Sequence, residues 1–183
     1  MSGLPPVRRA DKLMANESAL AMLAKGFCGR LATVGADGQP YCVPLLYLWI
    51  EGEVWLHNSR STGHLRAAID HEPRVCFEID EAGPVFPYGR FECDSTVAYR
   101  SVILFGRIRV VEDRALKQRF CEALMEKYGS KDWDRPKDFF PRLDHISVYA
   151  IAPERITGKE TPLPAVAAQW PSVDNTKTPD AKP

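Results

Sequence analysis

The sequence lacks an excess of charge of either sign. Its 183 residues carry 24 Lys and Arg against 24 Asp and Glu, so the formal net charge at pH 7 is zero. A chain with no basic excess cannot neutralise the phosphates along a duplex, which argues against a nucleic-acid partner. Local groups of basic residues can still bind a small anion.

Long apolar runs and paired cysteines are also missing. The N-terminal stretch MSGLPPVRRADK has no apolar segment typical of a signal peptide. No stretch approaches the roughly 18 apolar residues that a membrane helix needs. The cysteines show no C-x-x-C spacing and are odd in number: Cys28, Cys42, Cys76, Cys93 and Cys121. We therefore expect a cytoplasmic protein with free thiols and no membrane partner.

Several catalytic signatures are absent as well. There is no H-E-x-x-H, no nucleophile elbow, no P-loop and no G-x-G-x-x-G. The four histidines and five cysteines have no zinc-ligand spacing, so we expect no metal site. Hydrolytic and nucleotide-triphosphate chemistries therefore have no support in the sequence.

What the sequence does contain is a series of strand patterns with few helices. Asp37-Gly38 and Glu51-Gly52 mark tight turns between strand-like runs. The pattern predicts helices over 11–25 and 113–128, a short helix within 59–72, and strands at 28–35, 41–49, 53–58, 74–80, 97–111 and 144–152. No regular strand–helix–strand alternation appears, which favours a mainly β fold, a six-stranded barrel with flanking helices, over a layered α/β sheet.

The chain length suits one domain with tails. Residues 81–96 contain Gly and Pro without a period and predict a long loop. Six of the fifteen prolines follow Ala152, so residues 160–183 predict an extended, partly disordered Pro-rich tail. We expect an N-terminal arm at 1–10 and a barrel domain at 11–159.

The most informative segment joins the third strand to the short helix, His57 to Arg66. A strand ends, three hydroxyl side chains follow, and Gly63 lets the chain turn into a helix. The first N–H groups of a helix are unpaired and carry partial positive charge, and nearby basic residues add to it. This combination predicts a phosphate pocket. The structural alternative is a helix capped by Ser61 or Thr62, with solvated arginines.

Three further residues have both a functional and a structural interpretation. His57 shares a strand face with Trp55 and could contact a planar ligand, or it could be a half-buried histidine with a backbone partner. Pro44 cannot donate to a β ladder, so its strand should have an unpaired edge, either facing a ring system or protecting against aggregation. Arg100 needs a carboxylate, a ligand or another subunit if it is buried.

An ordered set of segments resembles a known family. These segments are RLATVGADGQPYCVPLLY (30–47), HNSRSTGHLR (57–66), PRVCFEID (73–80), YRSVILFGRIRVVED (99–113) and ISVYAIAPERITGK (146–159). Together they look like the flavin-binding proteins related to pyridoxamine 5′-phosphate oxidase, most closely the 5-nitroimidazole-resistance (Nim-type) group. The resemblance spans roughly residues 8–160. The substrate-binding pattern of the oxidases themselves is not recognisable, which argues against vitamin B6 oxidation.

The resemblance implies a split β-barrel homodimer that binds flavin mononucleotide (FMN) at the subunit interface. His57 matches a histidine at the active site of the resistance proteins and is the expected catalytic residue. Where many relatives carry Lys or Arg after the phosphate-loop glycine, this chain has His64, for which Arg60 and Arg66 could substitute. The cofactor-binding residues that the resemblance implies are Pro44, Leu45, Leu46, Tyr47, His57, Asn58, Ser59, Ser61, Thr62, Gly63, His64, Arg66, Arg100 and Ser101.

The expected function is flavin-dependent reduction of a small, nitro-aromatic-like electron acceptor. One alternative is a non-catalytic flavin carrier or sensor. Another is a haem-binding protein on the same barrel, with His57, His64 or His145 as the axial ligand. A third is a barrel without a cofactor that serves as an interaction module.

Overall fold

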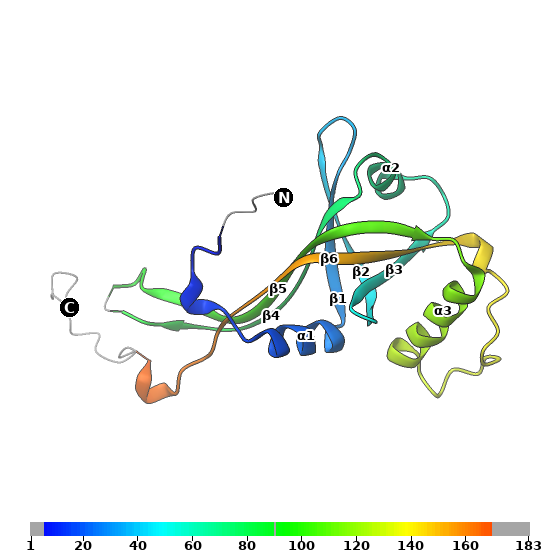
Figure 1. Ribbon diagram of the computed structural model, residues 1–183. Coiled ribbons are helices and arrows are strands. Elements are labelled where there is room, and N and C mark those ends of the chain that lie inside the picture. Colours follow the sequence, from blue (N-terminus) through cyan, green and yellow to red (C-terminus); the bar gives the residue numbers. More distant parts are fainter. Residues whose placement is uncertain (1–5, 90, 170–183) are drawn as a thin grey trace.

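Six antiparallel strands close into one barrel in the computed structural model, which describes residues 6–89 and 91–169. Neighbouring strands follow the order β1-β2-β3-β6-β5-β4 around the barrel. The expected mainly β, six-stranded split barrel with flanking helices is confirmed (Figure 1). The strands are β1 (Cys28–Val34), β2 (Pro40–Ile50), β3 (Glu53–Ser59), β4 (Arg74–Pro87), β5 (Ser95–Val111) and β6 (Ile146–Thr161).

Three α-helices flank the barrel: α1 (Asn16–Lys25), α2 (His64–His71) and α3 (Arg114–Tyr128). The first helix is shorter than the predicted 11–25, because a 3₁₀ turn at Ala10–Lys12 precedes it. Ala19, Met22 and Leu23 of α1 join the barrel core. Asp113 caps α3 by accepting a hydrogen bond from the Leu116 N–H at 2.8 Å, which fixes where this helix begins.

Two hydrophobic cores share the strands β3 and β6. Alternate residues such as Leu56 and Tyr149 point into the barrel and are fully buried. The residues between them, including Trp55 and Val148, lie on the outer face, where Phe120 and Leu124 of α3 cover them. Strands buried on both faces read as near-continuous apolar runs, which explains the sequence SVYAIA in β6.

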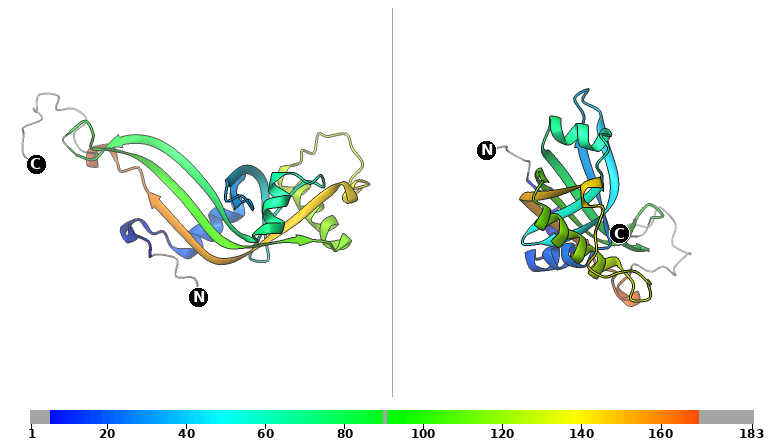
Figure 2. Two further views of the ribbon diagram at one scale, coloured as in Figure 1. Left: turned by 90° about the horizontal axis from the view of Figure 1, so that it is seen from above. Right: turned by 90° about the vertical axis from the view of Figure 1, so that its right-hand side faces the viewer.

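Strands β4, β5 and β6 continue beyond the barrel as an arm that points away from α3 (Figure 1, Figure 2). The prediction of a long loop over 81–96 is therefore wrong, because β4 extends to Pro87 and β5 starts at Ser95. A register shift between Ala82 and Val85 accommodates Gly83 and Pro84 as a bulge. Most of the β4 half of this arm is exposed, so no apolar alternation marked it as a strand.

Gly106 lies at a bulge in β5. The β5–β6 register shifts between Phe105 and Gly106, opposite Pro153. A Cβ atom on Gly106 would lie 2.3 Å from the Ala152 carbonyl oxygen, so only glycine permits this close approach.

The C-terminal boundary differs slightly from the expected domain end at 159. Strand β6 runs to Thr161, and a 3₁₀ turn follows at Val166–Ala168. The remainder of the expected tail, 170–183, lies outside the described residues.

Candidate functional site

The segment that joins β3 to α2 is anchored to the start of β6. Ser59 pairs with Ile146, and the Arg60 N–H donates to the His145 carbonyl at 3.0 Å. The Arg60 guanidinium also donates to the carbonyl of Asp144 at 3.0 Å. These contacts hold the strand end in place while Ser61 to Gly63 remain exposed.

The N-terminus of α2 has no side-chain cap. Gly63 is the N-cap residue, and no side chain accepts a hydrogen bond from the first turn. The alternative in which Ser61 or Thr62 caps the helix is therefore wrong. No atom lies within 4 Å of the point where a Cβ of Gly63 would stand. The first N–H groups of this eight-residue helix thus have no side-chain acceptor among the described residues and can bind an anion.

A polar cleft of about 270 Å³ lies beside this helix end. Its cations are Arg60, Arg66 and Lys117, and its carboxylates are Asp70 and Glu112. One Arg66 nitrogen lies 2.8 Å from an Asp70 oxygen, whereas the Lys117 amine lies 4.0 Å from the nearest Glu112 oxygen. Three cations against two carboxylates leave one positive charge in excess. The buried Ser147 and the exposed Thr62 complete the polar lining.

The predicted phosphate residues divide into two groups. Thr62 and Arg66 line the cleft. The His64 ring instead stacks on Tyr41, with ring centroids 5.9 Å apart, and is not among the residues that line the cleft. Asn58 accepts a hydrogen bond from the Tyr149 hydroxyl at 3.1 Å, an internal contact of the barrel. The geometry therefore favours arginines over His64 as the partners of an anion.

His57 lies on the outer face of β3, under α3. Its ring meets Phe120 edge-on, with centroids 5.5 Å apart. Its Nδ1 atom is buried and has no hydrogen-bond partner among the described residues. Burial lowers the pKa of His57 below the ordinary value of 6.5, so the imidazole is neutral at pH 7. His57 is thus suited to donating a neutral hydrogen bond rather than to carrying a positive charge.

The first half of β2 has one unpaired edge, as the position of Pro44 predicted. Residues 40–46 pair with β1, whereas β3 pairs only with 47–50. The backbone N–H and C=O of Tyr47 both point to the β1 side, where they bond to the Tyr128 hydroxyl. Because successive residues of a strand alternate the direction of their backbone groups, Leu46 directs its N–H and C=O, and Pro44 its C=O, to the unpaired edge. Backbone groups there can meet the polar edge of a ring.

Only two of the four predicted ring-binding residues on β2 face outward. Pro44 and Leu46 are exposed on the outer face. Leu45 packs against the barrel core, and Tyr47 is fully buried with its hydroxyl donating to the Leu23 carbonyl at 2.6 Å. Since Tyr47 pairs with Leu56, the next step of the register sets Leu46 beside His57, where the two strands diverge. The candidate ring platform and the candidate catalytic histidine are therefore neighbours.

Arg100 and Ser101 lie on the arm, away from the other predicted residues. Arg100 pairs with Glu160 near the end of β6, whereas Ser59 pairs with Ile146 at its start. At about 3.3 Å per residue, the two positions are roughly 45 Å apart along the strand. Arg100 is exposed and forms an ion pair with Glu81 at 2.5 Å, the structural alternative considered above. One chain alone does not bring these residues to the α2 cleft.

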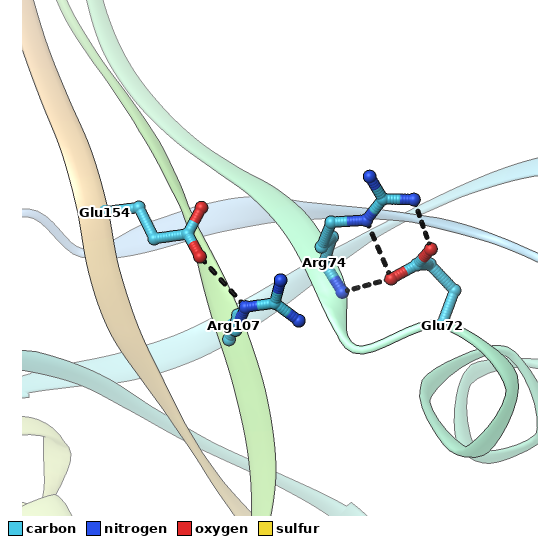
Figure 3. A network of polar contacts seen from close by, with 4 residues as sticks. All are labelled: Glu72, Arg74, Arg107 and Glu154. Carbon is cyan, nitrogen blue, oxygen red and sulfur yellow. Dashed lines mark hydrogen bonds and ion pairs between the residues drawn. The ribbon is translucent and has the colours of Figure 1, made fainter. Parts of the chain in front are cut away.

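A second, mostly apolar cavity of about 500 Å³ lies on the outer face of β1, β4 and β5. Arg74 lines this cavity, and Arg107 lies next to it, because the two arginines are paired across β4 and β5. Each has its own carboxylate, Glu72 at 2.6 Å and Glu154 at 2.9 Å (Figure 3). The rim charges thus cancel around an apolar floor that includes Ala32, Val34, Pro40, Cys76 and Phe105.

Comparison with known protein families identifies this architecture. The profile of the pyridoxamine 5′-phosphate oxidase family matches residues 15–160, which is most of the chain. The chain belongs to the pyridoxamine 5′-phosphate oxidase family. Among curated individual proteins, none matches this family member.

Solved structures share the fold of this pyridoxamine 5′-phosphate oxidase family member. A flavocytochrome from Azotobacter vinelandii is 18% identical, with a TM-score of 0.75 over 100% of this chain and 93% of that chain. The FAD and heme binding protein from Mycobacterium smegmatis is 23% identical, with a TM-score of 0.68 over 85% and 79%. A candidate 5-nitroimidazole antibiotic resistance protein from Bacteroides thetaiotaomicron is 18% identical, with a TM-score of 0.66 over 81% and 85%. At these identities the likeness shows the fold alone.

Sequence reasoning missed several residues of the site in this family member. Lys117 comes from α3 and Ser147 from β6, and no local motif marks either one. Phe120 covers His57 only because α3 folds back over β3. Tyr128 is also unmarked, although its hydroxyl lies 2.7 Å from the carbonyl oxygens of both Phe27 and Tyr47 and can donate to either.

The described part of this family member has neither a metal-binding cluster nor a membrane-spanning helix. No three His, Cys, Asp or Glu side chains come together there in a way that could hold a metal ion. None of the helices described there has the length and apolar character to span a bilayer.

The buried His57 predicts a pH-dependent contribution to stability. In the unfolded chain His57 binds a proton near pH 6.5, whereas burial lowers its pKa in the folded protein. The folded state therefore loses stability relative to the unfolded chain as the pH falls from 6.5 through the folded pKa. His57→Phe keeps the aromatic contact and should remove this loss. The free energy of unfolding in urea should fall less for the variant than for the wild type when the pH is lowered from 8 to 5.

His71→Asn, which removes an exposed histidine, is the matched control for this measurement. A constant difference between His57→Phe and the wild type at both pH values would show that His57 contributes nothing through its protonation.

Proposed function

We propose that this protein binds FMN and uses it to reduce a small, nitro-aromatic-like acceptor in the cytoplasm. The observation that carries the proposal is the open N-terminus of α2 beside a cleft with Arg60, Arg66 and Lys117. Partial positive charge and three cations at one point suit a phosphate dianion. The exposed outer face of β2 then offers a place for a flavin ring.

The solved structures of the same fold support a flavin over other ligands. The flavocytochrome and the FAD and heme binding protein are both flavoproteins by their descriptions. The protein from Mesorhizobium loti with this fold is also described as FAD-binding. We propose FMN rather than FAD because the cleft of about 270 Å³ fits one terminal phosphate.

Each part of the site has a separate task in this proposal. FMN would supply the redox chemistry when bound. Arg60, Arg66 and the α2 N–H groups hold its phosphate, while Pro44 and Leu46 provide a flat apolar surface for its ring. Backbone groups at the unpaired β2 edge bind the polar side of that ring. His57, beside Leu46, orients the acceptor through its neutral imidazole.

We further propose that two copies of the chain form the working unit. The cavity on the outer face of β1, β4 and β5 combines an apolar floor with cancelled rim charges, the composition of an interface core and rim (Figure 3). Val34 of β1 and Leu46 of β2, also on the outer face, are 43% and 36% exposed. Exposed apolar surface of this kind is typical of a site that another protein surface covers. In such a dimer, Arg100 and Ser101 on the arm of one chain would contact the flavin bound by the other chain.

A haem site on the same barrel is the second candidate, because two proteins of this fold are described as a flavocytochrome and a heme binder. The described geometry favours neither His64 nor His57 as an axial haem ligand, because His64 stacks on Tyr41 and the Nδ1 of His57 is buried beside Phe120. The visible spectrum of the purified protein separates the two cofactors: haem adds an intense Soret band, flavin does not.

The phosphate assignment predicts a difference between FMN and riboflavin. Arg60→Gln combined with Arg66→Gln removes two charge-assisted contacts and should weaken FMN binding roughly a hundredfold or more. Riboflavin, which has no phosphate, should bind the variant and the wild type within about threefold. Calorimetry measures both affinities, with Arg119→Gln as the control at an exposed arginine that does not line the α2 cleft. Equal losses for the two ligands would refute the phosphate pocket.

The reductase assignment predicts turnover as well as binding. Added reduced nicotinamide should bleach the FMN-loaded protein in the absence of oxygen, and a nitro-aromatic compound should restore the colour. His57→Asn should retain FMN but lower kcat about tenfold or more, because the acceptor loses its positioning group. Failure of reduced nicotinamide to bleach the flavin would favour a carrier or sensor instead.

The dimer predicts a mass near twice the 20.5 kDa of one chain in sedimentation velocity. Val34→Glu places a charge in the apolar cavity and should shift the protein to the monomer with release of FMN. Leu20→Glu, an exposed residue on α1, is the matched control and should leave the dimer intact. A wild-type protein that sediments as a monomer at micromolar concentration, with flavin bound, would contradict the proposal.

A further inference from the structure

Lys117 is the cation that α3 contributes to the α2 cleft. Its side chain is 12% exposed, and its amine lies 4.0 Å from an oxygen of Glu112, at the outer limit of an ion pair. The Glu112 side chain is 77% exposed, and so long a contact with an exposed carboxylate contributes little to stability. The amine of Lys117 is therefore available to an anion in the cleft.

The first turn of α3 is otherwise mostly exposed. Residues 114–116 are exposed, and the buried side chains of the helix begin at Phe120. Arg114 forms an ion pair with Asp144 at 3.0 Å, but both side chains are more than half exposed, so this pair also contributes little. Lys117 is thus the most enclosed side chain of a weakly held turn.

The next turn of α3 covers the candidate catalytic histidine. Phe120 is 1% exposed, and its ring meets the ring of His57 with centroids 5.5 Å apart. Lys117 and Phe120 are three residues apart and so lie on the same side of the helix. An opening of α3 from its N-terminal end therefore displaces Lys117 first and uncovers His57 next.

We propose that Lys117 binds the same phosphate group as Arg60 and Arg66, and so fastens the start of α3 in place over His57. A phosphate in the cleft then joins α2 to α3. Lys117 is a positioning residue in this arrangement, because it acts on His57 through α3. The inference rests on the phosphate cleft of the proposed function and adds a link from that cleft to the histidine.

Linkage gives this proposal a quantitative form. When the start of α3 opens, Lys117 leaves the cleft, whereas Arg60 and Arg66 belong to other elements and remain. A bound phosphate therefore disfavours the opening of α3 by the same factor that Lys117 contributes to the affinity for phosphate. One charge-assisted hydrogen bond corresponds to a factor of roughly ten or more.

Inorganic phosphate is the probe, and amide hydrogen exchange in the full-length protein measures the opening of α3. Excess riboflavin is present throughout, so that no flavin phosphate occupies the cleft. Saturating phosphate, compared with chloride at the same ionic strength, should slow exchange at the amides of residues 117–119 about tenfold. These amides begin the backbone ladder of α3, with the Lys117 N–H bonded to the Asp113 carbonyl.

Three variants separate the charge of Lys117 from its packing. Lys117→Met keeps the apolar stem, should abolish the slowing by phosphate, and should weaken phosphate binding in calorimetry by the factor that the slowing measures. Lys117→Arg should restore both effects. Arg119→Gln, at an exposed residue of the same helix that does not line the cleft, is the matched control and should behave as the wild type.

Unchanged exchange at residues 117–119 when phosphate is bound would overturn the inference, and so would equal phosphate affinity of Lys117→Met and the wild type. Either result leaves FMN binding by Arg60 and Arg66 intact. If phosphate instead slows exchange through Lys117 while FMN binds no more tightly than riboflavin, the inference holds and the flavin proposal fails. The exchange comparison uses the wild-type protein, so it remains decisive if a variant does not fold.

Discussion

The pairing of β3 with β6, buried on both faces, is the constraint on which the rest of the structure depends. Six residue pairs join the two strands, from Val54–Ile151 to Ser59–Ile146. The inner side chains fill the barrel, and the outer ones carry α3. This arrangement fixes where β3 ends, and so where the segment to α2 begins. It also places His57 on the outer face, against Phe120 of α3, and brings Lys117 to the cleft.

Opposite electrostatics on the two sides of Phe120 follow from this frame. The open end of α2 gathers arginines and helix N–H groups, which suits a phosphate. The cavity between α3 and the hairpin that joins β2 to β3 has more acidic than basic side chains in its lining, which disfavours an anion. A fold with zero net charge can thus hold two regions of different preference, because potential depends on local arrangement rather than on the total.

The course of residues 81–87 and the surroundings of His64 are two features that local sequence patterns did not reveal. Residues 81–87 read as a loop because an arm with little buried surface has no apolar alternation, and its bulge needs Gly83 and Pro84. His64 is predicted to hold the phosphate because it follows Gly63, and the structure adds a stacking contact between its ring and Tyr41. The contact between Tyr41 and His64 joins residues that are distant in the sequence, so no local motif marks it.

Local patterns in the chain were enough to predict the six strands and the mainly β class, and they singled out the segment 57–66 as a candidate site. These follow from period-two alternation, turn residues and helix-end chemistry, all of which act between near neighbours. Only the tertiary structure decided that Pro44 and Leu46 face outward, that Tyr47 is internal and that Arg100 lies far from the cleft. Those facts depend on barrel closure and register, which join residues distant along the chain and therefore leave no local signature.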